Sequence, residues 1–138
     1  MAIAPLKLMA EDAEDLAVIS AALQDAVAKI GDIQFDARAR ALTISFNRYR
    51  WEHKGSERVR SGLQIDSVLS VQARKLRPGA KDAVVELLTI TFEAGEAPAG
   101  ALTLTFAGGG DLRCQVECID AVLADVSAPW PTRKKPAH

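Results

Sequence analysis

Residues 47–60 (NRYRWEHKGSERVR) contain the side chains with the clearest capacity for chemistry. The segment combines five lysines and arginines with two glutamates, a tyrosine and a tryptophan. Guanidinium groups hold carboxylates and phosphates through paired hydrogen bonds, and Arg, Tyr and Trp dominate binding hot spots. We therefore predict a binding site for an acidic protein or a small anionic ligand. Its residues are Arg48, Tyr49, Arg50, Trp51, Arg58 and Arg60.

This segment is expected at the end of a β-hairpin, because apolar and polar residues alternate on both sides of it. The position of the loop centre predicts that Tyr49 faces Arg60 and that Trp51 faces Arg58 on the outer side of the sheet. Each pair would then place a guanidinium over an aromatic ring. An exposed cation–π contact of this kind is worth about 0.5–1 kcal/mol.

The same register turns Arg48 and Arg50 toward the core side, past the last apolar residue of the strand. Two guanidinium groups at that rim could hold a carboxylate or a phosphate. Together with His53 they define an alternative function, a small-ligand site or an enzyme site at the mouth of a barrel. A third interpretation is a solvated hairpin end in which Glu52 and Glu57 pair locally with the arginines, since exposed ion pairs contribute little.

The remaining motifs predict no metal, no cofactor and no catalytic residue. Cys114 and Cys118 lie in an alternating segment, where extended chain would separate their Cα atoms by ~13 Å, too far for a disulfide. A zinc site needs close pairs of ligands, and the only histidines are His53 and His138. The glycines at 108–110 lack the Lys and Ser or Thr of a phosphate loop, so we interpret them as a hairpin turn.

Composition narrows the class of protein. The chain has 138 residues, of which 49% are hydrophobic and 25% charged, with a net charge of −1. These values are typical of a globular domain and argue against a nucleic-acid partner.

The absence of a signal-like or membrane-spanning stretch, with two unpaired thiols, predicts a cytoplasmic protein without membrane contact. We expect one domain, residues 1–128, and a proline-rich basic tail, residues 129–138, whose Trp130 docks on the domain or on a partner.

Hydrophobic periodicity predicts two helices flanking a set of strands. The first helix covers about residues 12–30, begins at Asp12 and ends before Gly31. Its apolar stripe is Leu16, Ile19, Leu23, Val27 and Ile30. From residue 33 to residue 116 the period changes to two, which indicates six strands joined by short turns. The second helix covers about residues 118–126, with the stripe Ile119, Val122, Leu123 and Val126.

These elements predict an α+β fold. An N-terminal helix, an antiparallel meander of six to seven strands curling into a half-barrel, and a C-terminal helix follow one another, an order similar to the pleckstrin-homology-like superfold. The alternative is a curved sheet wrapped on the N-terminal helix, as in cystatin-like or nuclear-transport-factor-like folds. The loop centres pair Phe35 with Leu42, Phe46 with Leu63, Leu69 with Ile90, Phe92 with Leu102, and Phe106 with Leu112.

Five stretches carry a resemblance to a known family. They are LKLMAEDAEDLAVISAALQDAV, NRYRWE, TFEAGEAPAG, LTFAGGGDLRCQVECIDAVLAD and the terminal PAH. Over nearly its full length the chain resembles a small uncharacterised bacterial family, a domain of unknown function. This resemblance implies a single bacterial cytoplasmic domain, and it supplies no activity, cofactor or catalytic residue.

From the residues themselves we expect a non-enzymatic binding or assembly module. A rigid antiparallel sheet would present the basic and aromatic hairpin end to an acidic partner. A deep pocket with converging polar groups near Arg48, Arg50 and His53 would favour the small-ligand or enzyme alternative instead.

Overall fold

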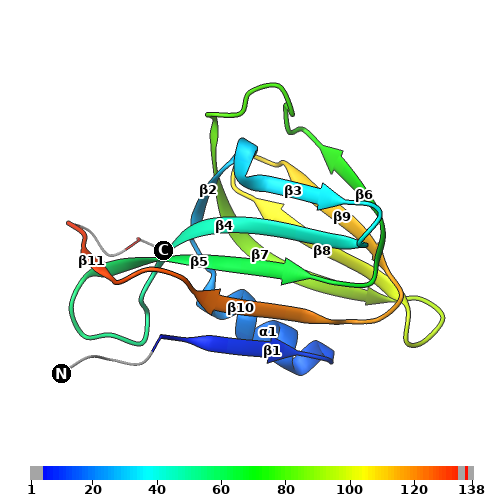
Figure 1. Cartoon of the computed structure of the whole chain (residues 1–138), viewed down its shortest axis with the longest axis horizontal. Coiled ribbons are helices and arrows are strands. Elements are labelled where there is room, and N and C mark those ends of the chain that lie inside the picture. The colour runs from blue at the N-terminus through cyan, green and yellow to red at the C-terminus, as the bar shows by residue number, and fades with distance from the viewer. Residues whose placement is uncertain (1–4, 134–135, 137–138) are drawn as a thin grey trace.

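The computed structural model describes residues 5–133 and residue 136, and it consists mainly of β-strands (Figure 1). Residues 1–4 of the expected domain, and residues 134, 135, 137 and 138 of the expected tail, lie outside the described residues. The described part has one α-helix, α1 (Ala13–Ala22), and one 3₁₀ turn, η1 (Ile30–Asp32). The strands are β1 (Lys7–Ala10), β2 (Val27–Lys29), β3 (Ile33–Asp36), β4 (Ala41–Tyr49), β5 (Glu57–Ile65), β6 (Val68–Arg74), β7 (Val84–Ala94), β8 (Gly100–Phe106), β9 (Asp111–Val116), β10 (Ala121–Asp125) and β11 (Trp130–Pro131).

The strands form one sheet that folds over on itself into two layers. Neighbouring strands follow the order β1-β10-β5-β4-β2-β7-β8-β9-β6, with β3 paired to β4 and β11 to β5. In Figure 1, β1, β10, β5, β4 and β3 make the front layer, and β7, β8, β9 and β6 make the rear layer. The bend is at β2, which pairs with β4 on one side and with β7 on the other.

The core lies between the two layers. In β4, Leu42, Ile44 and Phe46 are buried, while the intervening Thr43 is exposed. Strand β9 likewise buries every second side chain, and β8 does so from Leu102 to Phe106. Burying one such side chain contributes about 1.5–3 kcal/mol. Because apolar residues alternate with polar ones, each strand places its apolar side chains on one face, and burial of these faces holds the two layers together.

Helix α1 closes the gap along one edge of the two layers. It begins where the sequence predicts, because the Asp12 side chain accepts a hydrogen bond from the Asp15 amide at 2.8 Å. The buried Leu16 belongs to the core, and the helix packs against β1 and β7. The Ser20 hydroxyl accepts a hydrogen bond from the Ile90 amide at 2.9 Å, which satisfies a backbone donor of β7 beyond the end of β2.

The predicted extent of this helix was wrong. It ends at Ala22, and the chain then turns through Asp25, whose φ is 62°, into β2. The amide of Asp25 donates to the carbonyl of Leu87 at 2.8 Å, and the amide of Leu87 donates to Ala26 at 2.8 Å. These long-range hydrogen bonds to β7 stabilise a strand where the local apolar spacing would also permit a helix. The β-branched side chain of Val27 suits a strand at least as well as a helix.

The predicted C-terminal helix was also wrong. Residues 121–125 form strand β10, which lies between β1 and β5. Ala121 and Leu123 are buried, and Val122 and Ala124 are only partly buried on the other face. The spacing of the apolar residues is compatible with a helix or with a strand, and pairing with β1 and β5 stabilises the strand.

The fold is therefore mainly β rather than α+β, and the element order behind the pleckstrin-homology-like likeness is not present. The cystatin-like alternative is not present either, because the sheet folds into two layers that pack on each other and α1 lies along the edge between them.

The predicted strand registers are partly correct. Two are confirmed, Phe35 with Leu42 and Phe92 with Leu102. Two are shifted, so that Phe46 faces Ser61 and Leu104 faces Leu112. A shift by an even number of residues leaves every side chain on its predicted face, which is why the apolar pattern did not detect it.

The simple meander was wrong at β6. This strand pairs with β9 and not with β7, so Leu69 does not face Ile90 and is exposed instead. The turn between β5 and β6 contains Ser67 at a φ of 58° and carries the chain from the front layer to the rear layer. The connector at 75–83 then crosses to the other side of the rear layer, where the Lys81 carbonyl accepts a hydrogen bond from the Gly31 amide at 2.9 Å.

Candidate functional site

The end of the β4–β5 hairpin is organised around a fully buried arginine. Arg48, expected at an accessible rim, has 0% exposure. Its Nε and Nη2 donate to the two oxygens of Asp125 at 2.9 Å each, and its Nη1 and Nη2 donate to Glu52 at 3.0 and 2.7 Å. Nη1 also donates to the Tyr49 carbonyl at 3.4 Å. All five N–H groups of this guanidinium are therefore engaged within the chain.

Asp125 is the partner that the sequence did not reveal. Periodicity places it in the predicted second helix, where an acidic side chain gives no sign of being buried. As part of β10 it accepts hydrogen bonds from the Ser61 hydroxyl at 2.6 Å and from the Leu6 amide at 2.9 Å, besides those of Arg48. Four separate segments of the chain thus meet at one carboxylate.

The charges of this cluster shift one another's pKa values. Burial opposes the charged form of Arg48, but the hydrogen bonds and the attraction of Glu52 and Asp125 outweigh burial and raise its pKa. Hydrogen bonding from Arg48 lowers the pKa of Glu52. Burial raises the pKa of Asp125, but the hydrogen bonds from Arg48, Ser61 and the Leu6 amide outweigh it, so this pKa is lowered. The cluster is stable in its ionised form.

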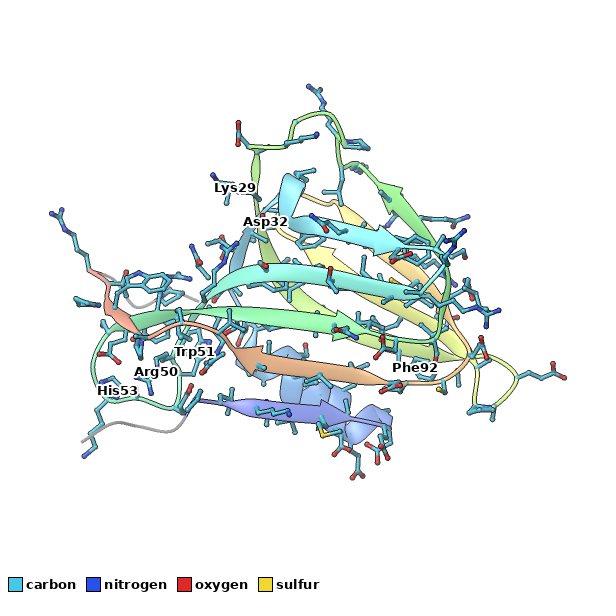
Figure 2. The ribbon with its side chains drawn as sticks, viewed as in Figure 1. Lys29, Asp32, Arg50, Trp51, His53 and Phe92 are labelled. Atoms are coloured by element: carbon cyan, nitrogen blue, oxygen red, sulfur yellow. The ribbon has the colours of Figure 1, made fainter. Side chains whose placement is uncertain are left out.

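Arg50 is the second arginine expected at the rim, and it too is buried. Its Nη1 donates to Glu57 Oε1, and its backbone amide donates to the Glu57 carbonyl at 2.9 Å. The Nε2 of His53 lies 3.4 Å from the same carboxylate oxygen. Figure 2 shows Arg50, Trp51 and His53 gathered at one end of the molecule. The internal glutamates thus occupy the positions that an anionic ligand would take.

The two aromatic residues of the hairpin contact each other. The ring centroids of Tyr49 and Trp51 are 4.7 Å apart in an edge-to-face arrangement with an interplanar angle of 61°. Tyr49 is buried, and in the sheet it faces Arg58 rather than Arg60. Trp51 lies past the end of β4, where its Nε1 donates to the Gln24 carbonyl at 3.2 Å. The aromatic pair therefore ties the hairpin to the segment that follows α1.

Arg58 and Arg60 are partly exposed and differ in their partners. Arg60 donates to Asn47 Oδ1 at 3.1 Å and to Asp32 Oδ2 at 3.0 Å. Arg58 donates from Nη1 to the Asn47 backbone carbonyl at 3.0 Å. Within the described residues no ion pair involves Arg58, so its charge is not balanced by a carboxylate there.

Trp130 docks on the hairpin. Strand β11 pairs with the start of β5, placing Trp130 opposite Arg58, and the Thr132 amide donates to the Ser56 carbonyl at 3.0 Å. Docking on the domain is one of the two outcomes expected for this residue, yet 36% of it stays exposed. Part of the segment predicted as a tail, residues 129–138, is thus added to the edge of the sheet.

The site has an inner part and an outer part. The inner part consists of saturated ion pairs that hold the hairpin. The outer part, which we call the cationic rim, combines Trp130 and the opposed Arg58 with exposed cations of the hairpin loop and of the segment after β11. None of the ion pairs formed by residues 5–133 includes a residue of the cationic rim. Its residues are Lys54, Arg58, Trp130 and Arg133.

The described residues hold no group of three or more His, Cys, Asp or Glu side chains arranged to bind a metal ion. Cys114 and Cys118 are both free, and Cys114 is buried, as its inward position in β9 predicts. In the same part of the chain, no helix has the length and apolar character needed to cross a bilayer.

The chain matches, over residues 6–138, the family described as "Protein of unknown function (DUF2948)". The chain therefore belongs to this family, and the resemblance to a domain of unknown function is confirmed. No curated protein and no solved structure matches the chain.

Proposed function

We propose that the protein is a non-enzymatic binding module that holds an acidic protein partner at the cationic rim. The observation that carries this proposal is the division of the hairpin end into a saturated interior and an unbalanced exterior. Arg48 and Arg50 hold the scaffold, while Arg58, Lys54 and Arg133 present charge to solvent. Uncompensated charges on a surface steer an oppositely charged partner toward it.

The exposed aromatic surface supports the same location. Trp130 is held in place by the pairing of β11 with β5 and lies directly opposite Arg58. A tryptophan fixed beside an arginine has lost most of its conformational freedom before binding, and such residues are typical of interface hot spots. An acidic segment with an apolar side chain fits this combination.

The alternative, a small-ligand or enzyme site near Arg48, Arg50 and His53, has less support. A ligand there would have to displace Glu52 from Arg48 or Glu57 from Arg50. Each guanidinium already holds a carboxylate, so an anion that replaces it exchanges one ion pair for another and gains little net affinity. An anion at the cationic rim meets no such competition.

We also place the protein in the bacterial cytoplasm as part of this proposal. The two free thiols support a reducing compartment, because such compartments keep cysteines unpaired. The bacterial source is supported by the resemblance alone.

The test uses a fluorescein-labelled peptide of glutamate residues as the acidic probe, with fluorescence polarisation as the readout. We expect the affinity to fall as salt is added, since dissolved ions screen the attraction between the exposed cations and the glutamates. The double variant Lys54→Ala with Arg58→Ala should weaken binding about tenfold, which corresponds to about 1.4 kcal/mol for the pair.

The matched control is Arg38→Ala with Arg113→Ala, which changes the net charge equally at exposed positions far from the hairpin. Equal weakening by both pairs would mean that net charge alone attracts the peptide, and the proposal would then be wrong. Unchanged binding by the Lys54 and Arg58 variant would equally remove the cationic rim as the site.

A further inference from the structure

A second surface of the molecule has the features of a peptide-binding edge. In the order of strands, β6 is a terminal strand that pairs only with β9 within the described residues. Strand β3 likewise pairs only with β4. Figure 1 shows both strands at the upper edge of the molecule, away from the hairpin end at the left. A terminal strand presents unpaired backbone N–H and C=O groups, which form a template for one more strand.

An apolar crevice separates these two edges. Its volume is about 140 Å³, and it opens between β3 with η1 on one side and β6 with the connector at 75–83 on the other. The residues that line it all carry apolar side chains: Ile30, Ile33, Ala73, Leu76, Pro78 and Leu112. Leu112 belongs to the buried core, so the crevice reaches inward from the surface to the core. Its size suits one aliphatic side chain.

The two strands beside this crevice also carry exposed apolar side chains. Phe35 follows Ile33 on the same face of β3 and remains 37% exposed. Leu69, in the irregular part of β6, is 53% exposed. Large apolar side chains beside an unpaired strand edge are the combination that natural proteins avoid unless something covers it.

The adjoining connector is strongly basic. The segment RKLRPGAKD, residues 74–82, carries four cations against one aspartate. Arg74 pairs with Asp111 at 2.5 Å, but no ion pair of the described residues includes Lys75, Arg77 or Lys81. All three are exposed. Whatever covers the edge therefore meets an excess of positive charge.

We propose that this edge binds an extended, acidic segment of a partner protein, which adds to β6 as a further strand and places one aliphatic side chain in the crevice. Strand addition supplies backbone hydrogen bonds, and a pocket for a side chain supplies specificity. A phosphate-bearing ligand would use the cations alone, leaving the strand edge and the apolar crevice without a role. A peptide with acidic residues uses all three features.

This surface is separate from the cationic rim, so the inference does not depend on the proposed function. The probe is a displayed library of random peptides, panned against the full chain, followed by fluorescence polarisation with a synthetic copy of an enriched peptide. We expect the enriched peptides to be acidic, rich in β-forming residues and to contain an aliphatic residue. Bound peptide should slow hydrogen exchange of amides in β6, because they become hydrogen-bonded.

Two variants test separate parts of the surface. Ala73→Trp fills the crevice from an exposed position, and Lys75→Glu with Arg77→Glu reverses the charge of the connector. Each should weaken peptide binding about tenfold or more, as truncation of a hot-spot side chain does. The charge-reversal variant keeps the test valid if Ala73→Trp disturbs folding, which circular dichroism would reveal.

The matched controls are Ala17→Trp, at an exposed alanine of α1, and Lys54→Glu with Arg58→Glu at the cationic rim. Ala17→Trp should leave the affinity unchanged, and the cationic-rim pair should weaken binding less than Lys75→Glu with Arg77→Glu does, since the rim itself attracts acidic peptides. Enriched peptides without acidic character, or binding that is abolished only in the cationic-rim variant, would overturn the inference. So would a concentration-dependent dimer in sedimentation that Ala73→Trp abolishes, because the occupant would then be a second copy of this chain.

Discussion

Arg48 and Asp125 are 77 positions apart in the sequence, yet they form a two-pronged ion pair inside the protein. Arg48 lies near the end of β4, and Asp125 ends β10. Strand β5 runs between them and contributes Ser61, whose hydroxyl donates to the same carboxylate at 2.6 Å. Backbone pairing joins these three strands, and the ion pair joins them again at the end that carries the hairpin.

This relationship predicts a large effect of Asp125→Ala on stability. The change leaves the Arg48 guanidinium buried with only part of its hydrogen bonds, and breaking a buried pair in this way costs about 3–5 kcal/mol. The measurement is the free energy of unfolding from chemical denaturation. Glu117→Ala is the matched control, because its pair with Arg40 is exposed and should contribute about 1 kcal/mol or less. If both variants lose equal stability, the buried cluster does not hold the hairpin.

The same cluster predicts loss of stability in acid. The pKa values of Asp125 and Glu52 are lowered in the folded protein from ordinary values of 3.8 and 4.5. A carboxyl group whose pKa is lower in the folded state stabilises that state above its unfolded pKa, and this contribution disappears as the pH falls through the folded pKa. We therefore expect the denaturation midpoint to be level near neutral pH and to fall below about pH 4.5.

Asp125→Asn provides the control for this pH dependence. The asparagine cannot titrate, so the variant should be less stable at neutral pH but should lose less further stability in acid. A variant whose midpoint falls with pH as steeply as that of the parent chain would assign the acid sensitivity to other carboxyl groups.

The strands of the core were predictable, because residues such as Leu42, Ile44 and Phe46 alternate with polar ones and one face is buried. The element at 118–126 was not, because its apolar spacing suits a helix and a strand equally. Its state depends on β1 and β5, which lie on either side of it and come from distant parts of the chain.

The candidate site shows the same limit. Residue types identified the hairpin end as basic and aromatic, and Trp130 was expected to dock. They did not reveal that Arg48 is buried, because the carboxylate that neutralises it belongs to a strand that the apolar spacing does not indicate. The pairing of β6 with β9 was equally hidden, since short connectors favour sequence neighbours and a turn at Ser67 instead carries the chain into the other layer.

A pair of strand glycines provides a third prediction, about packing. A Cβ added at Gly100 would lie 2.5 Å from the Glu93 carbonyl oxygen and 2.5 Å from Cζ of Phe92. Gly100→Ala should therefore destabilise the protein by about 1–3 kcal/mol, the usual cost of overpacking. At Gly62, also in a strand, nothing lies within 4 Å of the added atom. Gly62→Ala should leave the melting temperature unchanged or slightly raised, and equal losses at both positions would mean that backbone effects rather than the clash decide the outcome.

The last prediction concerns the two free cysteines. Cys114 is buried, and burial raises the pKa of its thiol from 9.0 to about 12. Since only the thiolate attacks a thiol reagent, this shift leaves a much smaller reactive fraction near neutral pH and slows labelling, and exclusion of the reagent slows it further. Cys118 lies just after β9 and is only partly buried, so it serves as an internal reference. In mass spectrometry after brief exposure to iodoacetamide, we expect the native chain to carry label at Cys118, and the denatured chain to carry it at both residues. Comparable labelling of Cys114 in the native chain would mean that β9 opens readily, which conflicts with its place between β8 and β6 in the rear layer.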